Sequence, residues 1–415
     1  TTNLTLASTS SGAVTIEDAG DTDISGTTGN LTVTEADALS LAGTVTGNLL
    51  VTSATSVTDS AALAVTGTTS ITTASNGAIT LDEDTNNLAG AVTVSSGSGA
   101  ITLDNSTNAL GVTSTSTGAV TIENAGALTV AGTMGSFTVT NASSVNDSAT
   151  LAVTGTTNID TSAGNGAVTL DDDANNLAGS VTVNSGSGAI TVDNNTNALG
   201  LVTTSSGAVT VEDAGALTLA GSMGSLVVTN ATSIADSAML SISGTSNLNT
   251  SVSNGAITLD QDDNSLAGTV TFNSGSGNVT LDNNTTALDM VSTSTGSVTV
   301  EDAGAVTASG TMGSFTVTSA SSFNDSGTLT ITGATGITTS DGAITLDDDS
   351  NNLGGTVTVS SGTGTITVDN NINALDLVTT STGAVTVEDA GALTVAGSMG
   401  SFTVTNATSV SDSAT

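Results

Sequence analysis

Groups of carboxylate side chains recur along this chain at a spacing that could bind cations. In each group an Asp follows a short alternating segment such as Ile79-Thr80-Leu81, a second Asp follows the next such segment, and a Glu follows the third. The chain has 38 Asp and Glu residues and no Lys, Arg or His, so it has no cationic side chain to neutralise them. We therefore expect external cations beside these acids. Ca²⁺ is the first candidate, because it prefers carboxylate and amide oxygens.

A further Asp, two positions after the first member, extends each group. The predicted cation ligands are Asp82, Asp84, Asp104 and Glu123 in the first group; Asp171, Asp173, Asp193 and Glu212 in the second; Asp260, Asp262, Asp282 and Glu301 in the third; and Asp347, Asp349, Asp369 and Glu388 in the fourth. Solvated turns have a similar composition, because Asp and Asn tolerate bends in the backbone. Two interpretations stay open, namely ordered Ca²⁺ sites and loosely held counterions.

The composition leaves little room for catalysis. Without His, Cys, Lys, Arg or Tyr, the chain has no usual general base near neutral pH, no thiol nucleophile and no cationic clamp for an oxyanion or phosphate. Paired carboxylates could serve a glycosidase, but the chain has no Trp or Tyr to hold a sugar, and its acids recur in every unit. We expect that the protein is not an enzyme.

The acids recur because the chain repeats itself. The stretch that begins at Gly118 returns 89 positions later at Gly207, and again at Gly296. Inside each long repeat the pattern Gly-x-apolar-Thr-apolar recurs in steps of 14 to 22 residues. The strict alternation and the β-branched residues predict strands, and no stretch has apolar residues at helical spacing. A step of about 18 residues suits one turn of a parallel β-solenoid.

The predicted fold is therefore all-β, a parallel β-helix of about two dozen turns in one continuous solenoid. Its predicted parts are a partial repeat at 1–11; long repeats at 12–117, 118–206, 207–295 and 296–382; and a partial repeat at 383–415. The first long repeat is expected to hold one extra turn, at 29–46. One segment of the long repeats reads "TTASNG", "TSAGNG", "TSVSNG" or "TSDG", and it accounts for the difference in length among the long repeats after residue 117. Such variation in length predicts a surface loop.

Stacked turns would align the acids as well as the core. Phe137, Phe315 and Phe402 share one position, Met134 and its repeats share another, and both are expected inside. Successive turns lie about 4.8 Å apart, so each acid group would form a column of like charges. With five turns in each long repeat, the column would recur about every 24 Å.

The charge and the ends of the chain bear on its partners. A formal net charge of −38 argues against nucleic acid and anionic membranes as partners. No apolar run is long enough for membrane insertion. Thr1 to Ser11 matches Thr196 to Ser206, so the chain starts inside a repeat. We expect either a window cut from a longer chain or identical copies stacked in a fibre.

The motifs "NNLAGAVTV" (Asn86 to Val94), "NNLAGSVTV" (Asn175 to Val183) and "GALTVAGTMGSFTVTNA" (Gly126 to Ala142) resemble the repeats of large bacterial surface proteins. These are the filamentous-haemagglutinin-like and autotransporter-like β-strand repeat proteins. The resemblance implies a secreted right-handed parallel β-helix that serves in adhesion, biofilm or a surface fibre. Our first hypothesis is an extracellular, cation-stabilised structural fibre, stalk or surface-layer segment. The alternatives are the scaffold of an adhesin whose binding module lies elsewhere and, more remotely, an ice-binding solenoid.

Overall fold

Alternating residues such as Val168-Thr169-Leu170 form short strands that pair in parallel with equivalent strands one turn away. The computed structural model describes residues 3–413, and no helix occurs among them. The chain divides into two units, Thr1–Glu212 and Asp213–Thr415. Both are parallel β-solenoids, and the chain holds about 22 turns of about 19 residues. The predicted fold class is confirmed.

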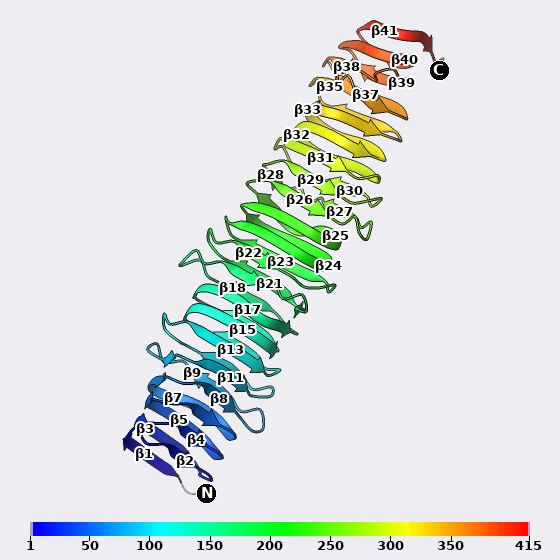
Figure 1. Ribbon diagram of the computed structural model, residues 1–415. Helices are drawn as coiled ribbons and strands as arrows, with labels where there is room; N and C mark the ends of the chain where they lie inside the picture. Colours follow the sequence, from blue (N-terminus) through cyan, green and yellow to red (C-terminus); the bar gives the residue numbers. More distant parts are fainter. Residues whose placement is uncertain (1–2, 414–415) are drawn as a thin grey trace. The chain divides into compact units, whose positions relative to one another are not determined.

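The strands of the first unit, coloured blue to green in Figure 1, range from two residues in β10 to twelve in β7 and β17. They are β1 (Leu4–Thr9), β2 (Val14–Ile16), β3 (Thr22–Thr28), β4 (Leu31–Val33), β5 (Ala36–Val45), β6 (Leu49–Val51), β7 (Ala54–Val65), β8 (Thr69–Thr72), β9 (Ile79–Leu81), β10 (Asn87–Leu88), β11 (Ala91–Ser95), β12 (Ile101–Leu103), β13 (Leu110–Thr115), β14 (Ala119–Ile122), β15 (Ala125–Met134), β16 (Ser136–Val139), β17 (Ala142–Val153), β18 (Thr157–Asp160), β19 (Val168–Leu170), β20 (Asn176–Leu177), β21 (Ser180–Asn184), β22 (Ile190–Val192), β23 (Leu199–Thr204) and the start of β24 (Ala208–Met223).

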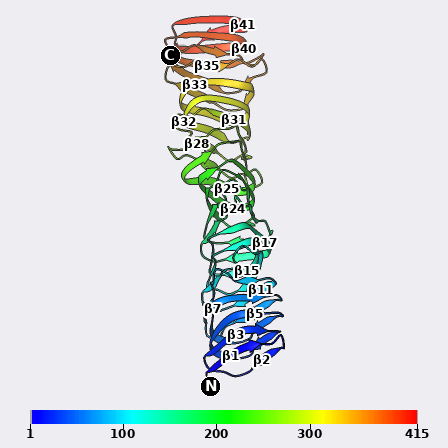
Figure 2. The same ribbon diagram turned by 90° about the vertical axis from the view of Figure 1, so that its left-hand side faces the viewer.

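The second unit contains several longer strands, because segments that are separate in the first unit run on without a break. After the end of β24 its strands are β25 (Ser225–Ile242), β26 (Ser246–Asn249), β27 (Ile257–Leu259), β28 (Ser265–Leu266), β29 (Val270–Asn273), β30 (Val279–Leu281), β31 (Leu288–Thr293), β32 (Ser297–Met312), β33 (Ser314–Ile331), β34 (Thr335–Thr339), β35 (Ile344–Leu346), β36 (Asn352–Leu353), β37 (Thr356–Gly362), β38 (Ile366–Val368), β39 (Leu375–Ser381), β40 (Ala384–Ser398) and β41 (Ser401–Asp412). Figure 2 shows the strands of each unit lying one above the next.

The strands of the first unit form two main stacks. One stack runs β2–β4–β6–β8–β11–β13–β15–β17–β19–β22–β24, and the other runs β1–β3–β5–β7–β9–β12–β14–β16–β18–β21–β23. Each turn of the solenoid therefore contributes one strand to each stack. The inward residues of both stacks fill the core, and outward Thr residues such as Thr80, Thr102 and Thr121 follow one another in single file.

The expected five turns in each long repeat are wrong; the pairing gives four and a half. Val120 pairs with Phe137 in one stack, whereas Val209, 89 positions after Val120, pairs with Ile190 in the other stack. The 14-residue step from Phe137 to Leu151 is not a full turn, because Leu151 pairs with Gly132 while Phe137 pairs with Thr157. Equivalent residues of the first two acid groups therefore lie in different stacks.

The predicted core is confirmed with exceptions near the end of the chain. Phe137, Phe315 and their counterpart Leu226 are fully buried, and Met134, Met223 and Met312 are at most 2% exposed. Phe402 is 36% exposed on β41, and Met399 is half-buried. The segments of variable length follow β8, β18, β26 and β34 and carry exposed residues, as predicted for surface loops.

Candidate functional site

The strand register aligns the members of each acid group, as predicted. In the first group, Asp82, Asp104 and Glu123 directly follow Leu81, Leu103 and Ile122, which pair across three successive turns. The same register holds for Leu170, Val192 and Val211 before the second group; Leu259, Leu281 and Val300 before the third; and Leu346, Val368 and Val387 before the fourth. Each group is therefore a column of acids along the solenoid.

The members of a column differ in their exposure to solvent. The first acids (Asp82, Asp171, Asp260, Asp347) and the Asp residues two positions later (Asp84, Asp173, Asp262, Asp349) are exposed. The Glu residues (Glu123, Glu212, Glu301, Glu388) are exposed or half-buried. The middle acids are buried; Asp104 is 0%, Asp193 2%, Asp282 3% and Asp369 1% exposed. The first acids and the Asp residues two positions later are thus the members that are exposed in all four columns.

The middle acids fix a tight turn. One carboxylate oxygen of Asp104 accepts a hydrogen bond from the Ser106 amide at 2.6 Å, and Ser106 has a left-handed backbone with φ of 53°. The equivalent bonds run from Asn195 to Asp193, from Asn284 to Asp282 and from Asn371 to Asp369, at 2.6 to 2.7 Å. These four predicted ligands therefore have a structural task, which agrees with the turn interpretation of the sequence.

A second set of acids, which the sequence analysis missed, supports the loops that carry the first acids. The carboxylate of Asp147 accepts hydrogen bonds from the amides of Asp171 and Asp172, both at 3.2 Å, and from Nδ2 of Asn175 at 2.6 Å. Asp147 is 5% exposed. Its equivalents Asp59, Asp236 and Asp325 make the corresponding three bonds in the other long repeats. The recurring Asp-Ser pair that starts at each of these acids was the available signal.

Asn side chains complete this support by replacing a strand partner. Oδ1 of Asn175 accepts a hydrogen bond from the Leu151 amide at 2.7 Å, and Oδ1 of Asn194 accepts one from the Leu177 amide at 2.6 Å. Nδ2 of Asn194 donates to the Ala198 carbonyl at 2.9 Å. Both Asn residues are fully buried. Side-chain amides and carboxylates thus satisfy backbone groups that have no strand partner at this corner of the solenoid.

The geometry of each loop originates in a register shift. Val130 pairs with Asp147, but Gly132 pairs with Leu151, so β17 has an additional bulge of Ser148, Ala149 and Thr150 opposite β15. The first paired segment of β15 and β17 ends at Asp147, where the bulge begins. The Asp147 side chain then accepts hydrogen bonds from the loop of the next turn. The corresponding shift between β32 and β33 follows Asp325.

Burial and, after it, the charges of neighbouring acids raise the pKa of several acids in the columns. Partial burial, followed by the charges of Asp82 and Asp104, raises the pKa of Glu123 above its usual value. Burial and then the neighbouring Asp charges also raise the pKa of Glu301 and of Glu388. Desolvation is the main cause of the raised pKa of Asp282, Asp347 and Asp369. These columns therefore destabilise their own charged form.

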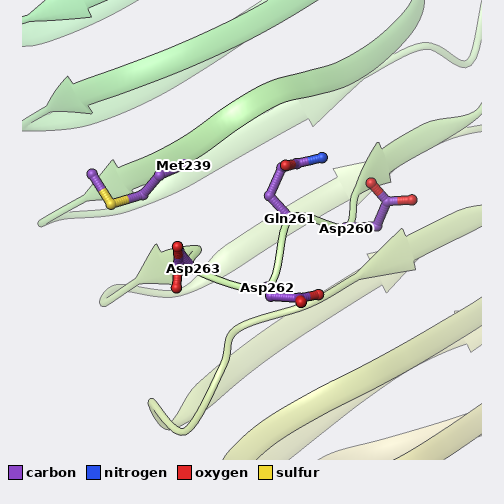
Figure 3. Close-up of a pocket in the computed structure, with 5 residues that line it drawn as sticks. All are labelled: Met239, Asp260, Gln261, Asp262 and Asp263. Atoms are coloured by element: carbon purple, nitrogen blue, oxygen red, sulfur yellow. The ribbon is translucent and has the colours of Figure 1, made fainter.

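Shallow hollows lie beside the acidic loops. In Figure 3 Asp260, Gln261, Asp262 and Asp263 stand on the loop after β27, with Met239 of β25 beside them around a hollow of about 260 Å³. Asp147, Ser148 and Asp171 to Ala174 line a related hollow of about 420 Å³. Within residues 3–413, no three acidic side chains come together in a way that could hold a metal ion. Ordered Ca²⁺ sites remain a prediction.

Comparison with known proteins identifies a family but no function. Residues 28–95, 117–184, 206–273 and 295–360, more than half of the chain, match the family described as repeats of unknown function (DUF5649), and the chain belongs to that family. The matched segments start 89 residues apart, and the first includes the turn at 29–46. No curated protein and no solved structure matches the chain. Residues 3–413 contain no helix that is long and apolar enough to cross a membrane.

Proposed function

We propose that this member of the DUF5649 repeats is a structural segment of an extracellular fibre, stalk or surface layer. The observation that carries the proposal is that every polar feature of note recurs once in each long repeat. The acid column, the supporting Asp and the two Asn side chains occur four times at equivalent positions. A binding or catalytic centre is normally a single place, whereas a spacer needs the same stabilising contacts along its whole length.

External cations are part of this proposal. Acids in one column are separated by about 4.8 Å per turn, where two like charges repel by about 1 kcal/mol in water and more beside the protein. Partial burial raises the pKa of Glu123, Glu301 and Glu388 most, and the charges of neighbouring Asp residues raise it further, which supports such repulsion. We propose that divalent cations such as Ca²⁺ collect in front of the exposed acids as loosely held counterions. This arrangement requires no chelating cluster.

The surroundings and partners follow from the same composition. Without Lys or Arg the chain offers no site to trypsin-like proteases, which suits long exposure outside a cell. We propose that its partners are further turns of the same kind, from the same chain or from identical chains in a fibre. A net charge of −38 argues against nucleic acid as a partner.

Electron microscopy of the protein on its native surface tests the proposal. A structural fibre or layer predicts filaments or sheets with regular order along or across the solenoid. Isolated, irregularly placed stalks that end in a separate globular module would overturn it in favour of the adhesin scaffold.

Thermal unfolding tests the role of cations separately. Loosely held counterions predict that Ca²⁺ and Mg²⁺ raise the melting temperature similarly and that high NaCl removes the difference. A large rise with Ca²⁺ alone, persisting in high NaCl, would replace this part of the proposal with ordered sites.

A further inference from the structure

Three loops of the solenoid contain the dipeptide Asn-Gly, which is prone to spontaneous chemical change. The dipeptides are Asn76-Gly77, Asn165-Gly166 and Asn254-Gly255, and each Asn is exposed. In a flexible chain the Gly amide nitrogen attacks Cγ of the Asn side chain. Ammonia leaves as a cyclic succinimide forms, and water then opens the ring to Asp or to isoaspartate. The balance is Asn plus water giving Asp plus ammonia, and no other reactant is needed.

The backbone of each loop favours Asn at the first position of this pair and requires Gly at the second. Asn165 has a left-handed backbone with φ of 53°, a conformation that Asn tolerates better than most residues. A Cβ on Gly166 would lie 1.9 Å from the backbone oxygen of Ser143 in the neighbouring turn, so only Gly fits. Gly77 and Gly255 approach Thr55 and Thr232 just as closely. The loops therefore cannot avoid the sequence by a simple substitution of the Gly.

Each loop also holds the two reacting groups in place. Oδ1 of Asn165 accepts a hydrogen bond from the Ser187 amide at 2.9 Å, so the side chain is fixed to the next turn. The Gly166 amide, which is the nucleophile, donates to the Thr161 carbonyl at 3.0 Å. The Gly166 carbonyl accepts a hydrogen bond from Oγ1 of Thr161 at 2.7 Å. The Gly166 nitrogen and the Asn165 side chain are thus held by different hydrogen bonds, one within the loop and one to the next turn.

The side-chain contacts recur around the other two Asn-Gly pairs, where the Gly77 amide donates to the Ala74 carbonyl at 3.0 Å and the Gly255 amide to the Thr250 carbonyl at 3.2 Å. Oδ1 of Asn76 accepts from the Ser98 amide, and Oδ1 of Asn254 accepts from the Ser276 amide, both at 2.9 Å. Thr73 and Thr250 take the role of Thr161 at the Gly carbonyl, at 2.6 and 2.7 Å. Three copies of one arrangement are therefore available for comparison within one molecule.

The fourth long repeat has Asp, the residue type that deamidation of Asn would produce, in a loop that is two residues shorter. Its loop contains Asp341-Gly342 in place of Asn-Gly, and Oδ1 of Asp341 accepts a hydrogen bond from the Thr363 amide at 2.9 Å. Oγ1 of Thr339 donates to the Gly342 carbonyl at 2.8 Å. An Asp side chain therefore makes the same contact with the next turn. Isoaspartate, which adds a carbon atom to the backbone, would disrupt these contacts.

We propose that Asn76, Asn165 and Asn254 are deamidation sites that the folded turn holds closed, so that conversion requires the loop to open. Conversion to Asp then leaves the contact with the next turn intact, whereas conversion to isoaspartate breaks it. Each conversion adds one negative charge to the acidic chain. The proposal does not depend on the proposed function, because it rests only on the contacts within each loop.

Peptide mapping by mass spectrometry tests the proposal, with an Asp- or Glu-directed protease because the chain lacks Lys and Arg. After incubation at mildly alkaline pH, each Asn-Gly is expected to deamidate at least about tenfold more slowly in the folded protein than in urea, since only the open fraction reacts. Equal rates in the folded and unfolded chain would overturn the proposal.

Matched variants locate the protection within one loop. Thr161→Val removes the hydroxyl that holds Gly166 and is expected to speed deamidation of Asn165 severalfold, while Asn76 and Asn254 keep their rates. Thr250→Val should act on Asn254 alone. Unchanged rates at the local Asn in both variants, or equal acceleration at all three sites, would contradict loop-by-loop control. Should either variant unfold, Asn165→Asp supplies a second test, since it should retain the melting temperature of the parent protein.

Discussion

Replacement of Asp147 by Ala tests whether the buried supporting acids hold the acidic loops of the next turn in place. The Asp147 carboxylate accepts three hydrogen bonds and is 5% exposed, so Ala leaves two backbone amides and the buried Asn175 amide without their acceptor. Hydrogen bonds to a charged group contribute about 1.5 to 3 kcal/mol each, but the two long bonds to the loop are the weaker ones. We expect a loss of about 3 to 5 kcal/mol in local stability.

Asp173→Ala is the matched control, because it also removes one negative charge but from an exposed side chain that makes no hydrogen bond within residues 3–413. The difference between the two variants isolates the hydrogen bonds from the relief of charge repulsion. Native-state hydrogen exchange at the Asp171 and Asp172 amides is the suitable assay, since a solenoid of this length need not unfold in one step. The reasoning is refuted if the two variants agree within about 0.5 kcal/mol.

The remaining predictions concern pH and the core. At low ionic strength the melting temperature should rise as the pH falls from 7 towards about 5. The pKa of Glu123, Glu301 and Glu388 is raised in the folded protein, so protonation of these groups favours the folded state. The pKa of Asp341 is lowered, so its contribution to stability is lost only at still lower pH. A steady fall of the melting temperature between pH 7 and about 5 would contradict the repulsion. Thr157→Val should stabilise the protein by about 1 kcal/mol in chemical denaturation, because Oγ1 of Thr157 is buried without a hydrogen-bond partner; outward-facing Thr138→Val, the control, should change stability little, and a loss in the Thr157 variant would count against the argument. Phe137→Ala should lower the free energy of unfolding by about 3 to 5 kcal/mol, and Phe402→Ala by much less, because Phe137 is fully buried and Phe402 is partly exposed. Similar losses in the two variants would contradict the role of burial at Phe137.

The period-two alternation and the 89-residue repeat were sufficient to predict the strands, the parallel stacking and the register of the acids. Phe137 is predicted to face inward because the local alternation alone determines which side of a strand faces the core, and its side chain is fully buried. The alignment of Asp82 with Asp104 and Glu123 followed from the same pattern, since each acid directly follows a paired residue.

The half turn required pairing information that no local pattern contains, and the recurring Asp-Ser pair marks the supporting acids without showing what they bind. The register shift between Val130 and Gly132 depends on how β15 pairs with a strand beyond it, and this pairing moves Leu151 into a different stack from Phe137. Asp147 gains its role only because the bulge brings it beneath the loop of Asp171 and Asp172. Asp104 and Asp82 look equivalent in the sequence, but their burial differs because only Asp104 turns inward to bind the Ser106 amide.

Cryo-electron microscopy of the native material tests whether the chain is a repeated structural segment of an assembly. Such a segment predicts ordered filaments or layers in which strands lie across the solenoid axis and successive turns are spaced by about 4.8 Å along it. Dispersed single molecules, each attached to a distinct binding module and without order between neighbours, would contradict the claim.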